Sequence, residues 1–137
     1  MPHLRDVRAL TLDAAKAMTA GAERFATERG WAVAVAVVDA AGGLILFHCL
    51  DDTQPGSQDI AVRKARTAAR LHRSTKMLED GIAAGRIALL TLPDVVALEG
   101  GLPIRVGGRV IGGIGVSGMG SAQDGEVAAA GLAALET

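Results

Sequence analysis

The sequence predicts an α+β fold, an α/β sandwich with a central antiparallel sheet of about five strands and helices packed on its faces. Two pairs of β-forming segments are each joined by a short glycine-containing turn, one at 39–43 and one at 107–108, which is the pattern of β-hairpins. Helical segments stand before, between and after these pairs. Hairpins that alternate with helices in this way favour an antiparallel sheet over a parallel one.

Composition limits the class of protein. A chain of 137 residues is expected to form a single domain, 1–137, and 50% hydrophobic but 2% aromatic residues predict a core of small and branched aliphatic side chains. A net charge of −1 gives no global support to nucleic-acid binding. One cysteine excludes an internal disulfide and fits a reducing compartment. The longest apolar run, Trp31–Val38, is far too short to span a membrane. We therefore expect a cytoplasmic protein.

The first half of the chain predicts a helix and a hairpin. Thr11 is a suitable N-cap, apolar residues then recur at helical spacing, and Gly30 is placed to end the helix. Ala32–Val38 is almost entirely apolar, which predicts a strand covered on both faces. After the turn, Leu44–Leu50 is the returning strand.

The second half predicts three helices and a second hairpin. Helical composition covers Ser57–Ser74 and Lys76–Ala84, whereas Ile87–Val96 is compatible with a strand or a loop. The second hairpin is expected from Pro103–Val106 and Arg109–Ser117. Ser121 is expected to cap the last helix, with Asp124 in the capping-box position.

A helical wheel separates Ser57–Ser74 into two faces. Lys64 falls inside the apolar arc, between Leu71 and Ala68, and His72 also falls there. A lysine directed at a core has to be ion-paired, line a pocket or extend its ammonium group to water, and all three interpretations stay open. His72 stands near the helix end, where we expect exposure. The opposite arc, interpreted as a solvated face, a subunit contact or an anion site, carries Arg63, Arg66, Arg70 and Arg73.

Polar residues of the first hairpin are further candidates. His48 and Cys49 are adjacent on a strand, so their side chains point to opposite faces and cannot simply share one metal. The chain has too few cysteines and histidines for a structural zinc site, and we predict no metal centre. His48 alone is either structural or an axial ligand to a haem or corrinoid. Asp51 and Asp52 are either solvated loop carboxylates or acid/base groups.

The glycine-rich stretch 100–118 contains a G-x-G-x-x-G pattern at Gly113, Gly115 and Gly118. Dinucleotide binding is excluded, because the pattern lacks the following βαβ unit and the acidic residue that such a site requires. Gly113 and Gly115 share one face of a strand, where a helix, another subunit or a flat ligand can approach the backbone. The stretch then leads to the N-terminus of the last helix, where free N–H groups suit an anion, although Asp124 in the first turn argues partly against one.

Six segments, in their order along the chain, resemble the GlcG/HbpS family, which includes the C-terminal domain of PduO-type proteins. The resemblance covers nearly the whole chain. The matching segments are Leu10–Ala15, Val35–Gly42, Asp59–Ala69, Gly100–Ile104, Ile114–Gly118 and Gln123–Asp124.

The resemblance implies an α/β sandwich that assembles into a homo-oligomer, often an octamer. It also implies that haem or a corrinoid is a candidate ligand, because some members bind one, and that an enzymatic role is plausible. One departure is Cys49, where the family commonly has an arginine, so a cation that would hold a ligand carboxylate is missing. The positions that match the family's recurring polar and glycine residues are Asp59, Lys64, Thr67, Arg73, Gly100, Gly101, Pro103 and Asp124.

Three functions follow as hypotheses. The first is an oligomeric protein that binds a haem-like ligand in a pocket near subunit interfaces, with His48, Asp51 and the matched positions as candidate ligand-binding residues. The alternative is a small enzyme of a catabolic pathway that acts on an organic acid or carbonyl compound. Lys64 would be its base, Schiff-base former or oxyanion partner, and Asp124 or Asp51 would complete an acid/base pair. The third is a scaffold subunit whose glycine face only packs.

Overall fold

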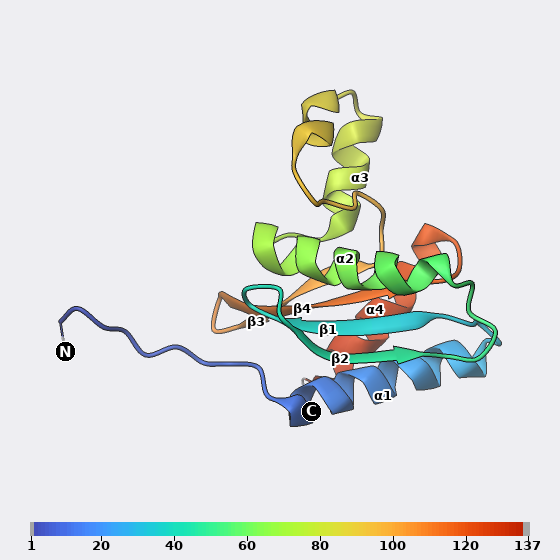
Figure 1. The fold of residues 1–137 in the computed structure, drawn as a ribbon, viewed down its shortest axis with the longest axis horizontal. Helices are drawn as coiled ribbons and strands as arrows, with labels where there is room; N and C mark the ends of the chain where they lie inside the picture. The colour runs from blue at the N-terminus through green and yellow to red at the C-terminus, as the bar shows by residue number, and fades with distance from the viewer. Residues whose placement is uncertain (1, 136–137) are drawn as a thin grey trace.

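The computed structural model describes residues 2–135. Four α-helices and a four-stranded antiparallel sheet make up the α+β fold (Figure 1). The elements are α1 (Leu12–Glu28), β1 (Ala34–Asp39), β2 (Leu44–Cys49), α2 (Gly56–Leu71), α3 (Thr75–Ala83), the 3₁₀ helix η1 (Ile87–Thr91), β3 (Gly101–Val106), β4 (Arg109–Ser117) and α4 (Ser121–Leu135).

The sheet has the order β2-β1-β4-β3, so the two hairpins are joined by pairing between β1 and β4. Figure 1 shows α2 on one face of the sheet and α1 with α4 on the other. Strand β1 is buried on both faces because its side chains alternate between these layers. Val35 and Val37 contact the α1/α4 side, whereas Ala34, Ala36 and Val38 contact the α2 side.

Two predicted local structures are confirmed. Thr11 caps α1, since its hydroxyl oxygen accepts a hydrogen bond from the Ala14 amide at 3.0 Å. Gly107 and Gly108 form the tight turn of the second hairpin, with φ values of 58° and 78°. At α4 the prediction is wrong in detail: Ser121 is already inside the helix, and the Gln123 side chain accepts from the Gly120 amide at 3.0 Å. Gly120 and Gln123 therefore take the capping-box positions.

The predicted strand number is also wrong, because the sheet has four strands and not about five. The ambiguous segment Ile87–Val96 forms η1 followed by a loop. Pro93 removes a backbone donor and Asp94 has a φ of 54°, so this segment cannot extend a sheet. The helix predicted over Ser57–Ser74 ends at Leu71, because His72 is left-handed with a φ of 56°, and Ser74 instead caps α3.

The glycine face of β4 packs against α2. A Cβ atom at Gly113 would lie 3.1 Å from the Ala69 amide nitrogen, and one at Gly115 would lie 3.0 Å from the Ala65 Cα atom. Both would also overlap a carbonyl oxygen of the helix. The close approach predicted from the alternation of small residues is therefore made by a helix of the same chain.

Figure 1 shows α3 and η1 projecting from the sandwich beyond α2, and the N-terminal segment extending away from α1. The projecting part exposes large apolar side chains, including Met77, Ile87 and Leu90 at 60–70% of their surface. Within residues 2–135, no helix has the length and apolar character needed to cross a membrane.

Candidate functional site

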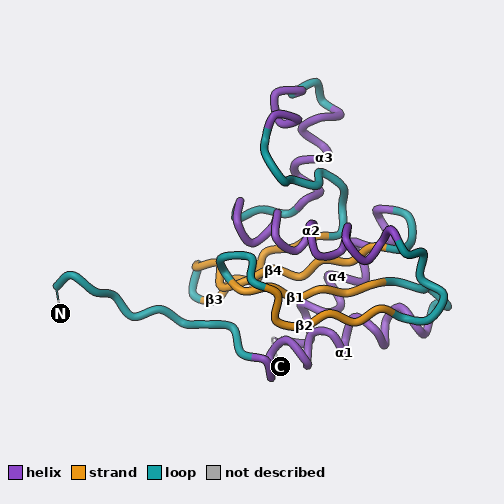
Figure 2. The backbone as a smooth tube through the Cα atoms, in the orientation of Figure 1, coloured by secondary structure: helices purple, strands orange, loops and turns teal. Residues whose placement is uncertain are grey.

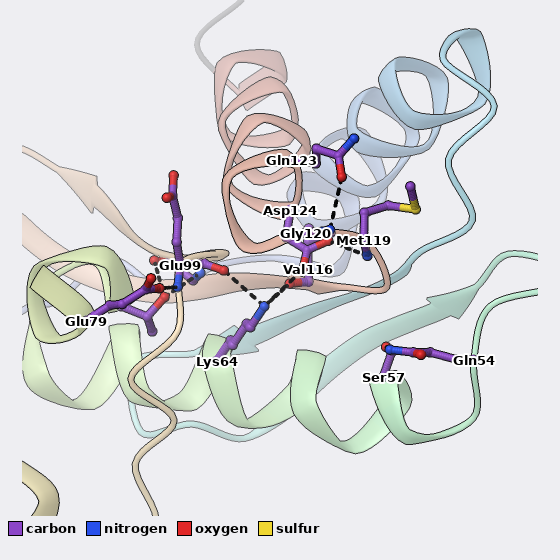
Figure 3. A network of polar contacts seen from close by, with 12 residues as sticks. Gln54, Ser57, Lys64, Glu79, Glu99, Val116, Met119, Gly120, Gln123 and Asp124 are labelled. Carbon is purple, nitrogen blue, oxygen red and sulfur yellow. Dashed lines mark hydrogen bonds and ion pairs between the residues drawn. The ribbon is translucent and has the colours of Figure 1, made fainter. Parts of the chain in front are cut away.

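Lys64 is buried at the centre of the polar network drawn in Figure 3, with 2% of its surface exposed. It lies on the face of α2 that packs on the sheet, as the helical wheel predicted. Its ammonium nitrogen donates to the carbonyl oxygens of Glu99 and Val116, both at 3.0 Å, and to Asp124 Oδ2 at 3.2 Å. A lysine ammonium group has three N–H donors, so all of them are used.

Asp124 completes this arrangement from the first turn of α4. Its Oδ1 atom accepts a hydrogen bond from the Met119 amide at 2.9 Å, while Oδ2 faces Lys64. Burial raises the pKa of the Asp124 carboxyl above its ordinary value, and the Met119 amide and the Lys64 ammonium group oppose that shift only in part. Of the interpretations left open for Lys64, the geometry supports the buried ion pair.

The glycines matched to the family lie against the same ion pair. A Cβ atom at Gly100, whose φ is 136°, would lie 2.8 Å from Lys64 Nζ and 3.1 Å from Asp124 Cβ. Gly101 packs on the Lys64 backbone, and its amide donates to Thr75 Oγ1 at 2.8 Å. Only residues without side chains fit at these two positions, which explains the glycine pair by packing.

Thr67 connects the same helix to the loop that follows η1. Its hydroxyl group donates to the Arg63 carbonyl at 2.8 Å and accepts from the Val96 amide at 3.1 Å. Together with the Lys64 bond to Glu99, this contact fixes the segment between η1 and β3. The network therefore cross-links α2, β4, α4 and this loop, and a catalytic role for Lys64 would require one of its three bonds to open.

The other predicted site residues do not gather around Lys64. Asp59 is exposed and paired with Arg63 at 2.8 Å, within one helix. Arg73 is exposed and donates to the Leu71 carbonyl at 3.1 Å, and Asp51 is an exposed loop residue. Pro103 lies on β3 opposite Gly113, on an edge strand, where a missing backbone donor is tolerated.

Two arginines of the predicted arc have a structural role. Arg66 donates to the Gly42 carbonyl and Arg70 to the Ala41 carbonyl, each at 2.9 Å, so both hold the turn between β1 and β2 against α2. Asp39 completes that turn by accepting from the amides of Ala41 and Gly43.

His48 lies on the edge strand β2, on the side of the sheet that α1 covers. Its Nδ1 atom is in hydrogen-bond contact with Glu23 Oε1 of α1, and 51% of the His48 side chain is exposed. A carboxylate only accepts, so Nδ1 donates this hydrogen bond and Nε2 is not used in it. No described residue bonds Nε2. The ring is thus oriented with one nitrogen open to a ligand.

A hollow that the sequence analysis did not anticipate lies at the hairpin end of the sheet. It measures about 750 Å³ and lies between the N-terminal segment and the β3–β4 hairpin. Its polar lining combines Arg5 and Arg8 with Arg109 and His72. These residues are too far apart along the chain for any spacing rule to join them. Among residues 2–135, no group of three or more histidine, cysteine or acidic side chains is placed to hold a metal ion.

Comparisons with known proteins are consistent in fold and in sequence. A family model described as "Haem degrading protein HbpS-like" matches residues 10–133. Protein GlcG of Escherichia coli is 41% identical over 108 residues, which cover 79% of this chain and 81% of GlcG. The crystal structure of Klebsiella pneumoniae protein ORFY is 33% identical, with a TM-score of 0.92 over 100% of this chain and 97% of that chain. The PduOC:haem complex is 30% identical, with a TM-score of 0.83 over 93% and 95% of the two chains.

Proposed function

This chain belongs to the family of haem-degrading HbpS-like proteins, and we propose that it is a cytoplasmic, oligomeric protein that binds haem or a related tetrapyrrole. The proposal rests on one observation, the His48–Glu23 pair. A histidine that ligates a metal commonly donates its other ring N–H to a carboxylate, which fixes the tautomer and makes the ligating nitrogen more basic. His48 has this second partner. The ring of His72, in contrast, has no hydrogen-bond partner among the described residues.

The surroundings of His48 suit one face of a planar, apolar ligand. Leu46 of β2 and Leu50, the residue after β2, are only partly buried against the core on the side where His48 lies. Because β2 is an edge strand, the other face of the ligand needs cover from outside this chain, and a second copy would supply it. When bound, the haem iron would supply an open coordination position. His48 would hold the iron, and Glu23 would orient the imidazole.

Further support comes from the PduOC structure, which is a haem complex and shares the fold of this chain. Lys64 and Asp124 give less support to an enzyme, because the three donors of Lys64 are already bonded within the protein.

We expect purified protein to give a saturable Soret band when haemin is added, and His48→Ala to weaken or abolish it, since the substitution removes the only histidine with a carboxylate partner among the described residues. Absorbance titration measures both. Glu23→Gln should keep the band but weaken binding by about tenfold, within the range found for partners of metal ligands.

The matched control is His72→Asn, because asparagine tolerates the left-handed backbone at that position. It should leave the haemin titration unchanged. A titration identical to free haemin for the unaltered protein would overturn haem binding. Loss of the band in His72→Asn but not in His48→Ala would instead place the ligand in the hollow at the hairpin end and refute the site proposed here.

We also infer that copies of this chain associate through the projecting part formed by α3 and η1, which exposes Ile87 and Leu90. Leu90→Glu should lower the mass measured by analytical ultracentrifugation, because a buried, unpaired carboxylate opposes association. Leu4→Glu, at an equally exposed apolar residue of the N-terminal segment, is the control and should leave the mass unchanged. A monomeric unaltered protein would contradict the inference.

A further inference from the structure

We propose that the hollow at the hairpin end is a second binding site, specific for a small organic anion with two carboxylates on an apolar skeleton. The hollow of about 750 Å³ is within the range typical of small-molecule sites. Its lining comes from the N-terminal segment and the β3–β4 hairpin, and Figure 2 shows the N-terminal loop and the turn of that hairpin at the same end of the molecule. This inference does not depend on haem binding at His48.

Three arginine side chains at the hollow have no partner among the described residues. Arg5, Arg8 and Arg109 line the hollow, and none of their guanidinium groups makes a hydrogen bond or ion pair with any residue from 2 to 135. The arginines of α2 differ, since Arg66 and Arg70 are bonded to the turn between β1 and β2. All three arginines are exposed, and their free donors around one hollow give it a positive potential that favours an anion. A guanidinium fork pairs with a carboxylate through two parallel hydrogen bonds.

The charge of the lining sets the charge of the ligand. Asp6 is the one acidic residue among those that line the hollow, so three arginines leave a net charge of about +2 while His72 is neutral. The whole chain has a net charge of −1, so this end of the molecule is positive against a weakly negative background. Such a local excess attracts a dianion in preference to a neutral or singly charged molecule.

The apolar part of the lining indicates what should connect the two carboxylates of the ligand. Val7, Val106, Val110 and Ile111 give the hollow an apolar wall, and the turn glycines have no side chains to obstruct it. Such a wall can contact the carbon skeleton of a dicarboxylate, whereas inorganic phosphate and sulfate have no apolar part for it to contact. The arginines stand on two separate segments, so carboxylates at both ends of one molecule would bridge the N-terminal segment and the hairpin.

Isothermal titration with succinate, glutarate and phthalate tests this site. Dimethyl succinate serves as the uncharged analogue, and phosphate serves as an anion without a skeleton. We expect at least one dicarboxylate to bind saturably, dimethyl succinate not to bind, and phosphate to bind at least tenfold more weakly. Arg109→Gln and Arg8→Gln should each weaken dicarboxylate binding by about tenfold or more, the loss expected for one charge-assisted pair.

Arg24→Gln is the matched control, because Arg24 is an exposed arginine of α1 whose side chain also makes no hydrogen bond or ion pair with a described residue but lies outside the hollow. It should leave binding unchanged. An equal loss in Arg24→Gln, phosphate binding as tight as that of every dicarboxylate, or no saturable binding by any of them would overturn the proposal. His48→Ala should not affect dicarboxylates, and Arg109→Gln should not affect the haemin titration. Loss of the Soret band in Arg109→Gln would make the hollow the tetrapyrrole site and refute a separate dicarboxylate site.

Discussion

Replacing Lys64 with methionine is expected to lower the free energy of unfolding at pH 7 by about 3–5 kcal/mol, the usual cost of removing one partner of a buried ion pair. Methionine replaces the aliphatic stem of lysine but not its three donors. The Asp124 carboxylate, with 3% of its side chain exposed, then loses its cation, and the carbonyls of Glu99 and Val116 lose their donor. Denaturant-induced unfolding followed by circular dichroism measures the loss.

The loss should depend on pH with a defined sign. Burial already raises the folded-state pKa of Asp124, and Lys64→Met removes the two effects of Lys64 that oppose this rise. Between the unfolded pKa and this higher folded pKa, the folded state binds more protons than the unfolded state, so stability falls as pH rises through that window. The defect of Lys64→Met should therefore be largest at neutral pH and shrink as the pH falls toward the raised pKa.

Asp124→Asn should be much milder than Lys64→Met. Lys64 is then left without its counter-ion but keeps its bonds to the Glu99 and Val116 carbonyls, whereas in Lys64→Met the Asp124 carboxylate keeps only the Met119 amide. Asparagine also has nearly the same shape as aspartate. Its amide oxygen can still accept one of the two hydrogen bonds that Asp124 accepts. We also expect Lys64→Met combined with Asp124→Asn to be more stable than Lys64→Met alone, because the unpaired buried charge is then gone.

The exposed pair of Lys76 and Asp80 is the matched control for this series, since it joins the same two residue types at 2.7 Å on the surface of α3. Lys76→Met should cause no measurable loss, because solvent screens an exposed pair. A pH-independent defect in Lys64→Met, or a loss in Asp124→Asn as large as that of Lys64→Met, would show that the buried pair does not act as described here.

Periodicity located Lys64 but could not locate its partners. A helical wheel assigns a residue to a face from its neighbours on one helix, so a lysine in an apolar arc is visible in the sequence alone. Asp124, Glu99 and Val116 lie between 35 and 60 residues further along the chain. Asp124 became a candidate only through the family resemblance, and the two carbonyl acceptors belong to the backbone, which leaves no side-chain signal. Three open interpretations of Lys64 were therefore the most that the pattern allowed.

The strands also include features that the sequence predicts and features that it does not. Both hairpins were predictable because turn residues and β-formers are local features. The fifth strand was wrong, since apolar residues in Ile87–Val96 suit a strand as well as a projecting turn, and Pro93 was the local signal against it. The hollow joins Arg5 to Arg109, and only the folded chain brings these residues together. A surface arginine has no sequence feature that shows whether a partner is present.

The second large effect is expected at the contact between β4 and α2. Gly115→Ala should lower the free energy of unfolding by about 3 kcal/mol, the upper end of the usual cost of overpacking a core. The new methyl group would lie 3.0 Å from the Ala65 Cα atom and would overlap the Ala61 carbonyl. Both neighbours are backbone atoms of one helix, so no side chain can rotate away, and relief requires α2 to move off the sheet. Denaturant-induced unfolding measures this cost, provided that the dependence of the unfolding free energy on denaturant concentration is the same in both proteins.

Substitutions at two further glycines separate the effect of steric overlap from the effect of backbone conformation. Gly107→Ala has no atom within 4 Å of the new Cβ but keeps a φ of 58°, so it should cost about 1 kcal/mol through conformation alone. Gly56→Ala, at the first residue of α2, meets no atom within 4 Å and needs no positive φ, so it should leave stability unchanged or raise it by about 0.5 kcal/mol. If Gly115→Ala cost no more than Gly107→Ala, α2 would be free to shift on the sheet. The Lys64 network, whose bonds to β4 and α4 depend on that spacing, would then not be held by the glycine face.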